Sequence, residues 1–246
     1  MNLAWYISIG LHLALLLRLL NLGAWRNYRA LVVYLAAAVC RSLTLVWFSP
    51  YTLRYFYIWT VTEPILLLAS AAVAVEVYRS LCSHYRGIEQ ISKFLFAASL
   101  AVAAVAATAP LFFEQQFLHA SGLVLLKTMM FVAMRFIYSA LAAFTASIII
   151  FTLLHPETIR RNVRWYAVMA ALYFMRNAAQ ALTATSSHTV LANTLVLPLS
   201  AALMAVWLCF MRSAGEKLEP RHPFANRGAI DEFDRQLLGA VRNLRP

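Results

Sequence analysis

Five ionisable residues lie inside long apolar stretches of the sequence, and their side chains could together bind an anion. They are Arg41, Glu63, Lys127, Arg135 and Arg176. A charged residue at the centre of a bilayer costs about 2.5–3.5 kcal/mol on insertion scales, so each one is a candidate functional residue. The four cations outnumber the single carboxylate. Since guanidinium groups hold carboxylates and phosphates through two parallel hydrogen bonds, this excess of positive charge predicts an anion site.

Polar and aromatic residues at helical spacing accompany these charges. One apolar segment carries a polar stripe of Tyr173, Arg176, Asn177 and Gln180, and Tyr138 lies near Arg135 on another. Lipid would not tolerate such faces, so they should turn towards the interior of a helix bundle. The predicted ligand-binding residues are therefore Arg41, Glu63, Lys127, Arg135, Tyr138, Tyr173, Arg176, Asn177 and Gln180.

Two interpretations of these charges remain open. In the first, Glu63 pairs with one or two arginines, Lys127 extends to the membrane surface, and the other arginines bond backbone carbonyls. In the second, the charges converge on an outward-facing cavity that binds a carboxylate, a phosphate or a lipid head group. Arg135 or Arg176 would then act as the clamp on that anion.

The composition places these residues in a membrane protein. Of the 246 residues, 62% are hydrophobic and only 13% are charged, whereas a soluble domain carries about 25% charged residues. This excludes a soluble enzyme or a nucleic-acid-binding domain. The formal net charge of +11 is then an indicator of membrane topology, because basic residues collect on the cytoplasmic side, and no nucleic-acid partner is expected.

Apolar segments bounded by charges or prolines predict seven transmembrane helices in an all-α bundle over residues 1–211. They are expected at 3–20, 29–48, 54–78, 91–109, 123–151, 163–185 and 190–211. Alternate connections and the tail hold 16 of the 21 Lys and Arg residues. The positive-inside rule therefore places the N-terminus outside and the C-terminus in the cytoplasm.

Residues 212–246 form a polar cytoplasmic tail that contains one amphipathic pattern. Apolar residues recur at spacings of three and four, which predicts a helix at about 229–244: Ile230, Phe233, Leu237, Val241 and Leu244. Such a helix either lies on the inner membrane surface or docks on a protein partner.

Several chemistries lack their residues. The last predicted span has no lysine for a retinal Schiff base, and no predicted span carries a His-x3-His pair for zinc or haem. There is also no Gly-x-Ser-x-Gly motif. We therefore predict no catalytic residues, no cofactor and no metal site, although an activity on a lipid is only disfavoured.

One region carries a family resemblance. The run from Tyr55 to Trp59 leads to Glu63, and Glu76 begins the sequence Glu-Val-Tyr-Arg, which ends at Arg79. This region resembles the third helix of uncharacterised seven-helix proteins of the bacterial inner membrane, and the layout is similar to the seven-helix sensory regions that precede histidine kinases. The resemblance implies an inner-membrane protein that receives a signal. Because no kinase domain follows, it would signal through a partner.

We therefore expect a membrane sensor or scaffold that binds an anionic ligand or lipid and contacts a partner through its tail. The alternative is a small transporter of an anionic or zwitterionic solute. Pseudo-symmetry between the first three and the last three spans would favour transport, whereas an asymmetric bundle would favour sensing. No repeat of 20–50 residues is evident in the sequence.

The charge distribution predicts the topology directly. A reporter fused after Pro246 should be active in the cytoplasm, and one inserted near His188 should be active outside, because the basic connections stay inside. Reporters with the opposite activities would show that the protein is inserted in the reverse orientation.

Overall fold

A computed structural model describes residues 3–48, 52–82, 88–109, 122–153, 161–183 and 189–211. Within these ranges the chain forms only helices: α1 Leu3–Asn21, the 3-10 helix η1 Ala24–Arg26, α2 Arg29–Val46, α3 Leu53–Cys82, α4 Ile88–Thr108, α5 Gly122–Leu153, α6 Arg161–Thr183 and α7 Thr189–Phe210. The predicted all-helical class is confirmed. The tail at 212–246, including its predicted helix at 229–244, lies outside the described residues.

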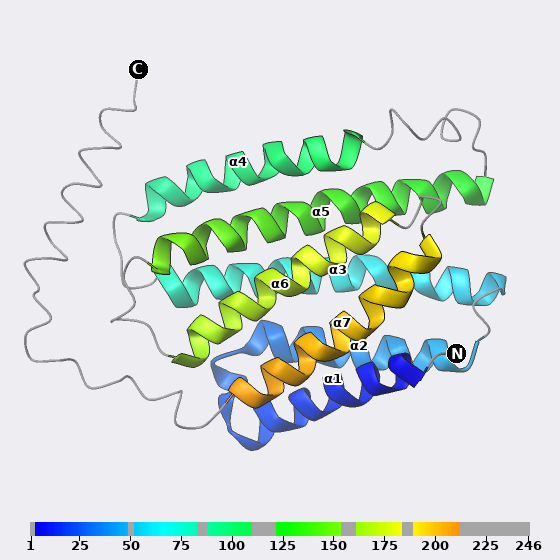
Figure 1. The fold of residues 1–246 in the computed structure, drawn as a ribbon, viewed down its shortest axis with the longest axis horizontal. Coiled ribbons are helices and arrows are strands. Elements are labelled where there is room, and N and C mark those ends of the chain that lie inside the picture. The colour runs from blue at the N-terminus through cyan, green and yellow to red at the C-terminus, as the bar shows by residue number, and fades with distance from the viewer. Residues whose placement is uncertain are drawn as a thin grey trace, which may run out of the picture.

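The helices run alternately in opposite directions (Figure 1). By their packing, α1, α2 and α3 form one group, and α5, α6 and α7 form another. Helices α1, α2 and α3 pack on one another in chain order, and so do α5, α6 and α7. The two groups meet where α1 packs on α7 and where α3 packs on α5 and α6. Helix α4 lies at the edge of the bundle and packs mainly on α5.

Small residues hold α4 against α5. Ser99, Ala103 and Ala107 recur at every fourth position and are buried, whereas the large side chains of Phe94 and Val105 are exposed. Since α5 is the main neighbour of α4, the small residues lie at that interface. Small side chains let two helix backbones approach closely, as the alanine-rich sequence of α4 predicts.

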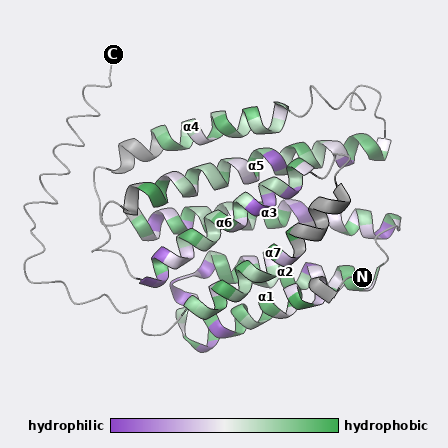
Figure 2. Ribbon diagram, viewed as in Figure 1, coloured by the Kyte–Doolittle hydropathy of each residue, from purple (hydrophilic) through white to green (hydrophobic). Residues whose placement is uncertain are grey.

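Three helices are long and apolar enough to cross a membrane: α2, the part of α3 from Leu53 to Leu81, and the part of α5 from Gly122 to Ile150. Shorter apolar helices cover Trp5–Asn21, Phe94–Thr108 and Pro198–Phe210. Figure 2 shows hydrophobic residues along most of the bundle and hydrophilic ones near the middle of α5 and α6.

Helix α6 combines polar residues with deep burial. It carries three arginines, yet about half of its residues are buried, including Tyr173 and Asn177. Its neighbours α3, α5 and α7 cover it. The prediction that the polar stripe on this segment faces the interior is therefore confirmed for these two residues.

A carboxylate from α3 caps the beginning of α2. The first amides of a helix have no acceptor within that helix. Glu76 accepts hydrogen bonds from the backbone N–H groups of Ala30 at 3.0 Å and Leu31 at 3.3 Å, and the Tyr166 hydroxyl of α6 donates to it at 2.7 Å. The negative charge also lies at the favourable end of the α2 dipole. Glu76 thus links three helices at one end of the bundle.

A second link closes the same end between α1 and α7. Gly23 ends the turn after α1 with a φ of 65°, in the left-handed conformation that glycine adopts without strain. The Arg18 side chain donates from Nε to the Met211 carbonyl at 2.8 Å, just after α7. A cation near the C-terminal end of a helix is electrostatically favourable.

The contacts of Glu76 predict the effect of its removal. Glu76→Ala should lower the free energy of unfolding by about 1–3 kcal/mol, because buried donors of α2 and Tyr166 lose their acceptor. The exposed Arg79, three residues further along α3, provides the control, and Arg79→Ala should change stability by less than about 0.5 kcal/mol. Thermal unfolding in detergent would measure both variants. Equal stability losses would show that Glu76 is not a specific cap.

Candidate functional site

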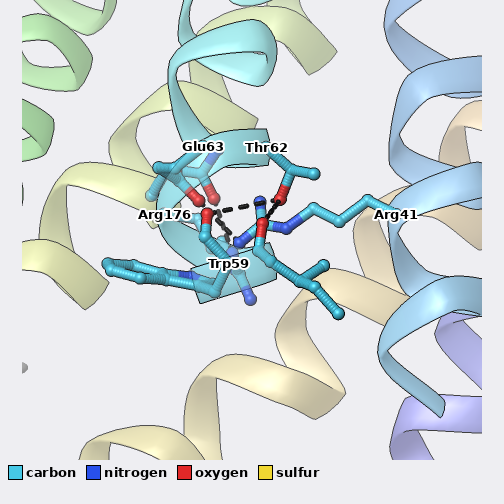
Figure 3. A network of polar contacts seen from close by, with 7 residues as sticks. Arg41, Trp59, Thr62, Glu63 and Arg176 are labelled. Atoms are coloured by element: carbon cyan, nitrogen blue, oxygen red, sulfur yellow. Dashed lines mark hydrogen bonds and ion pairs between the residues drawn. The ribbon is translucent and has the colours of Figure 1, made fainter. Parts of the chain in front are cut away.

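Arg41 of α2 and Glu63 of α3 form an ion pair in the interior of the bundle. The Arg41 Nη2 and Glu63 Oε2 atoms are 2.6 Å apart, and the two side chains are only 15% and 3% exposed. Figure 3 shows Arg41 extending from α2 to the Glu63 carboxylate. Of the alternatives that the sequence left open, the structure thus selects Arg41 as the partner of Glu63.

The backbone hydrogen bonds of α3 are interrupted next to this pair. Pro64 follows Glu63 inside the helix and has no N–H to donate to the carbonyl of Thr60. The Thr62 hydroxyl turns back to its own helix and donates to the carbonyls of Ile58 at 2.7 Å and Trp59 at 3.2 Å (Figure 3). The only buried carboxylate among the described residues thus lies next to a proline that removes one backbone hydrogen bond of its helix.

Three buried tyrosines extend the ion pair into the bundle. Tyr138 of α5 lies close enough to Glu63 to interact with its carboxylate and also interacts with Tyr173 of α6. The ring of Tyr34 in α2 packs edge-on against Tyr173, with centroids 5.8 Å apart. Tyr173 therefore lies where groups from α2, α5 and α6 meet.

His12 joins these aromatic side chains from α1. Its Nδ1 donates a hydrogen bond to the Ser8 carbonyl at 2.6 Å. The imidazole lies edge-on to Tyr173, with ring centroids 6.4 Å apart, and within electrostatic range of Arg176. We call Arg41, Glu63, Tyr138, Tyr173, Arg176, Asn177, Tyr34 and His12 the polar cluster.

Arg176 is the cation of the polar cluster that lacks a carboxylate. Its Nη1 donates to Asn177 Oδ1 at 2.5 Å, and its guanidinium lies 5.9 Å from the centroid of the Tyr173 ring. Its Nε is buried without a hydrogen-bond acceptor, and it forms no ion pair within the described part of the chain. Because Nη1 is occupied, the edge formed by Nε and Nη2 is the one open to a two-pronged acceptor.

Arg135 has a different environment. Its side chain is fully buried, and Nε donates to the Ala181 carbonyl of α6 at 3.0 Å. This agrees with the interpretation in which an arginine bonds a backbone carbonyl. The Arg135 Nη1 atom is also buried, without a hydrogen-bond partner of its own.

The remaining two candidates lie outside the polar cluster. Lys127 is exposed in the second turn of α5, with its ammonium 6.0 Å from the centroid of the Phe131 ring. Gln180 is half-buried on α6, one turn beyond Arg176. Of the nine sequence-predicted residues, the structure therefore gathers Arg41, Glu63, Tyr138, Tyr173, Arg176 and Asn177.

Tyr34 and His12 belong to the cluster but were not among the sequence-predicted site residues. Tyr34 precedes Arg41 by seven residues, which places both on one helix face. His12 is the only histidine within the first predicted span. Both signals are present in the sequence, but neither identifies the helix that the side chain would meet.

No protein-family model matches this chain, and no curated protein or solved structure is detectably similar to it.

The ion pair makes a prediction that separates structural from functional charges. Arg41→Gln and Glu63→Gln should each cost roughly 3–5 kcal/mol of stability, because each leaves a buried charge without its partner. The double variant should recover much of this loss, which a double-mutant cycle in detergent would measure. Additive losses would show that the two side chains do not stabilise each other.

Proposed function

We propose that this protein is an integral membrane protein with seven transmembrane helices that binds an anionic ligand at Arg176. Its N-terminus would lie outside and its C-terminus in the cytoplasm of a bacterial inner membrane. The apolar helices and the large exposed side chains of the bundle support membrane insertion. The alternation of basic and neutral connections supports the orientation.

One observation carries the binding site: Arg176 lies in the polar cluster without a carboxylate partner among the described residues. Its buried Nε has no hydrogen-bond acceptor. Glu63, the buried carboxylate among the described residues, is already paired with Arg41. A cation in a low-dielectric interior is costly unless an anion neutralises it. Since the described residues do not supply that anion, a ligand is the natural source.

The surrounding side chains suit a small, partly aromatic or apolar anion. Tyr173 and Tyr34 offer ring faces and hydroxyls, and Asn177 fixes the guanidinium orientation through its Oδ1 atom. Such a combination of apolar walls and a few polar groups is typical of small-molecule sites. Lys127 is exposed near the beginning of α5 and would not contribute.

Sensing and transport are both compatible with this site. Signalling through the tail helix at 229–244 stays a prediction from the sequence. The packing of the helices favours transport as the second candidate, because α1, α2 and α3 pack in the same order as α5, α6 and α7. Repeated helix groups with a binding site between them are characteristic of many transporters. Uptake of a radiolabelled anion into proteoliposomes would distinguish transport from binding alone.

The binding site can be tested with Arg176→Gln and the matched control Lys127→Gln. We expect chloride, phosphate or benzoate to raise the melting temperature of the wild type and of Lys127→Gln, because a bound anion stabilises the folded state. Arg176→Gln should fold at least as stably as the wild type without anion but should lose this response. If Arg176→Gln unfolds, or still responds like the wild type, Arg176 is not the anion-binding group.

A further inference from the structure

Glu63 meets polar side chains from the helices that pack on α3. Arg41 of α2 lies 2.6 Å from its carboxylate, and Tyr138 of α5 interacts with the same group. Tyr173 of α6 interacts in turn with Tyr138. Arg135, one turn before Tyr138 on α5, donates instead to a backbone carbonyl of α6. The cation that balances the charge of Glu63 is therefore Arg41.

Hydroxyl groups beside Glu63 offer a route for a proton. Tyr138 interacts both with Glu63 and with Ser70, and Ser70 is fully buried. Ser70 follows Glu63 by seven residues, so it lies on the same face of α3, about 10.5 Å further along the helix. A hydroxyl group can donate one hydrogen bond while it accepts another. A proton at Glu63 can therefore be exchanged with neighbouring polar groups.

Two tyrosines connect Glu63 with Arg176. Tyr138 interacts with Glu63 and with Tyr173, and the guanidinium of Arg176 lies 5.9 Å from the centroid of the Tyr173 ring. Figure 3 includes Arg176 in the same polar network as Arg41 and Glu63. Charges inside a protein are screened less than charges in water. A negative charge at Arg176 would therefore act on the carboxylate of Glu63.

The charges of the polar cluster link an anion to a proton. Two guanidiniums, Arg41 and Arg176, and one carboxylate, Glu63, give a net charge of +1 when His12 is neutral. One bound anion reduces this charge to zero, and one proton on Glu63 restores it. An anion at Arg176 repels the ionised Glu63 and so favours its protonation. By linkage, protonation of Glu63 favours the anion equally.

We propose that Glu63 is a proton-binding site and that one proton binds there with each anion that binds at Arg176. This inference rests on the proposed anion binding and names the ion that accompanies the ligand. The Glu63 carboxylate takes the proton from water and becomes a neutral carboxylic acid, and it returns the proton when the anion leaves. Arg41 keeps its charge throughout. If the protein is a transporter, the anion and the proton cross the membrane together.

The proton can be counted by calorimetry of benzoate binding in phosphatidylcholine nanodiscs, with empty nanodiscs as the blank. Titrations in two buffers that differ in ionisation enthalpy give the number of protons taken up per benzoate. We expect the wild type to take up close to one proton wherever Glu63 is ionised before binding. In that range the affinity for benzoate should rise about tenfold for each unit by which the pH falls.

Matched variants assign the proton to Glu63. Glu63→Gln alone leaves Arg41 buried without its partner, so the test uses the double variant Arg41→Gln/Glu63→Gln. The double variant should bind benzoate without proton uptake and with an affinity that does not change with pH. Glu76→Gln is the control, because Glu76 is the other glutamate of α3 and lies outside the polar cluster. This control should take up protons like the wild type.

The possible outcomes separate the proton site from the anion site. Benzoate binding to the wild type without proton uptake would overturn the proton site and leave the anion site at Arg176 intact. Unchanged uptake in the double variant would also overturn it, and loss of uptake in His12→Gln would then assign the proton to His12. Absence of benzoate binding to the wild type would contradict the anion site itself, and the proton site with it.

Discussion

The cost of placing an ionised side chain in a low-dielectric interior governs how this bundle is built. The charged groups inside the bundle find their partners by different means. Glu63 pairs with Arg41, Arg135 donates to the Ala181 carbonyl, and Glu76 accepts the first amides of α2. The most polar helix, α6, is covered by α3, α5 and α7, while apolar side chains face outwards. Arg176 has no carboxylate partner among the described residues, and the proposed function follows from that.

Arginines lie 135 positions apart on α2 and α6, and only Arg41 has an ion-pair partner among the described residues, Glu63 of α3. Arg176 instead contacts side chains of its own helix, Asn177 and Tyr173. Tyr173, against which both His12 and Tyr34 pack, then lies beside the open guanidinium edge. A site enclosed by helices of both groups would also suit alternating access, in which one group moves against the other.

The sequence predicts the helical class well, because long apolar segments bounded by Pro50, Pro110 and Pro156 leave few alternatives. It also predicts which face of α6 is polar, since helical spacing determines that face. It does not predict the partner of Glu63, the exclusion of Lys127 or the role of Glu76 as a cap, because each depends on which helices become neighbours. Helices α2 and α6 carry identical residues 135 positions apart, a separation that a search for periods of 20–50 residues does not cover.

The most direct measurement is an experimental structure of the protein, in lipid, with 4-bromobenzoate bound and the bromine located by its anomalous scattering. The account predicts a carboxylate against the Nε and Nη2 edge of Arg176 and an intact pair between Arg41 and Glu63. It would be contradicted by a protein carboxylate seated against Arg176, or by bromine located only away from the polar cluster.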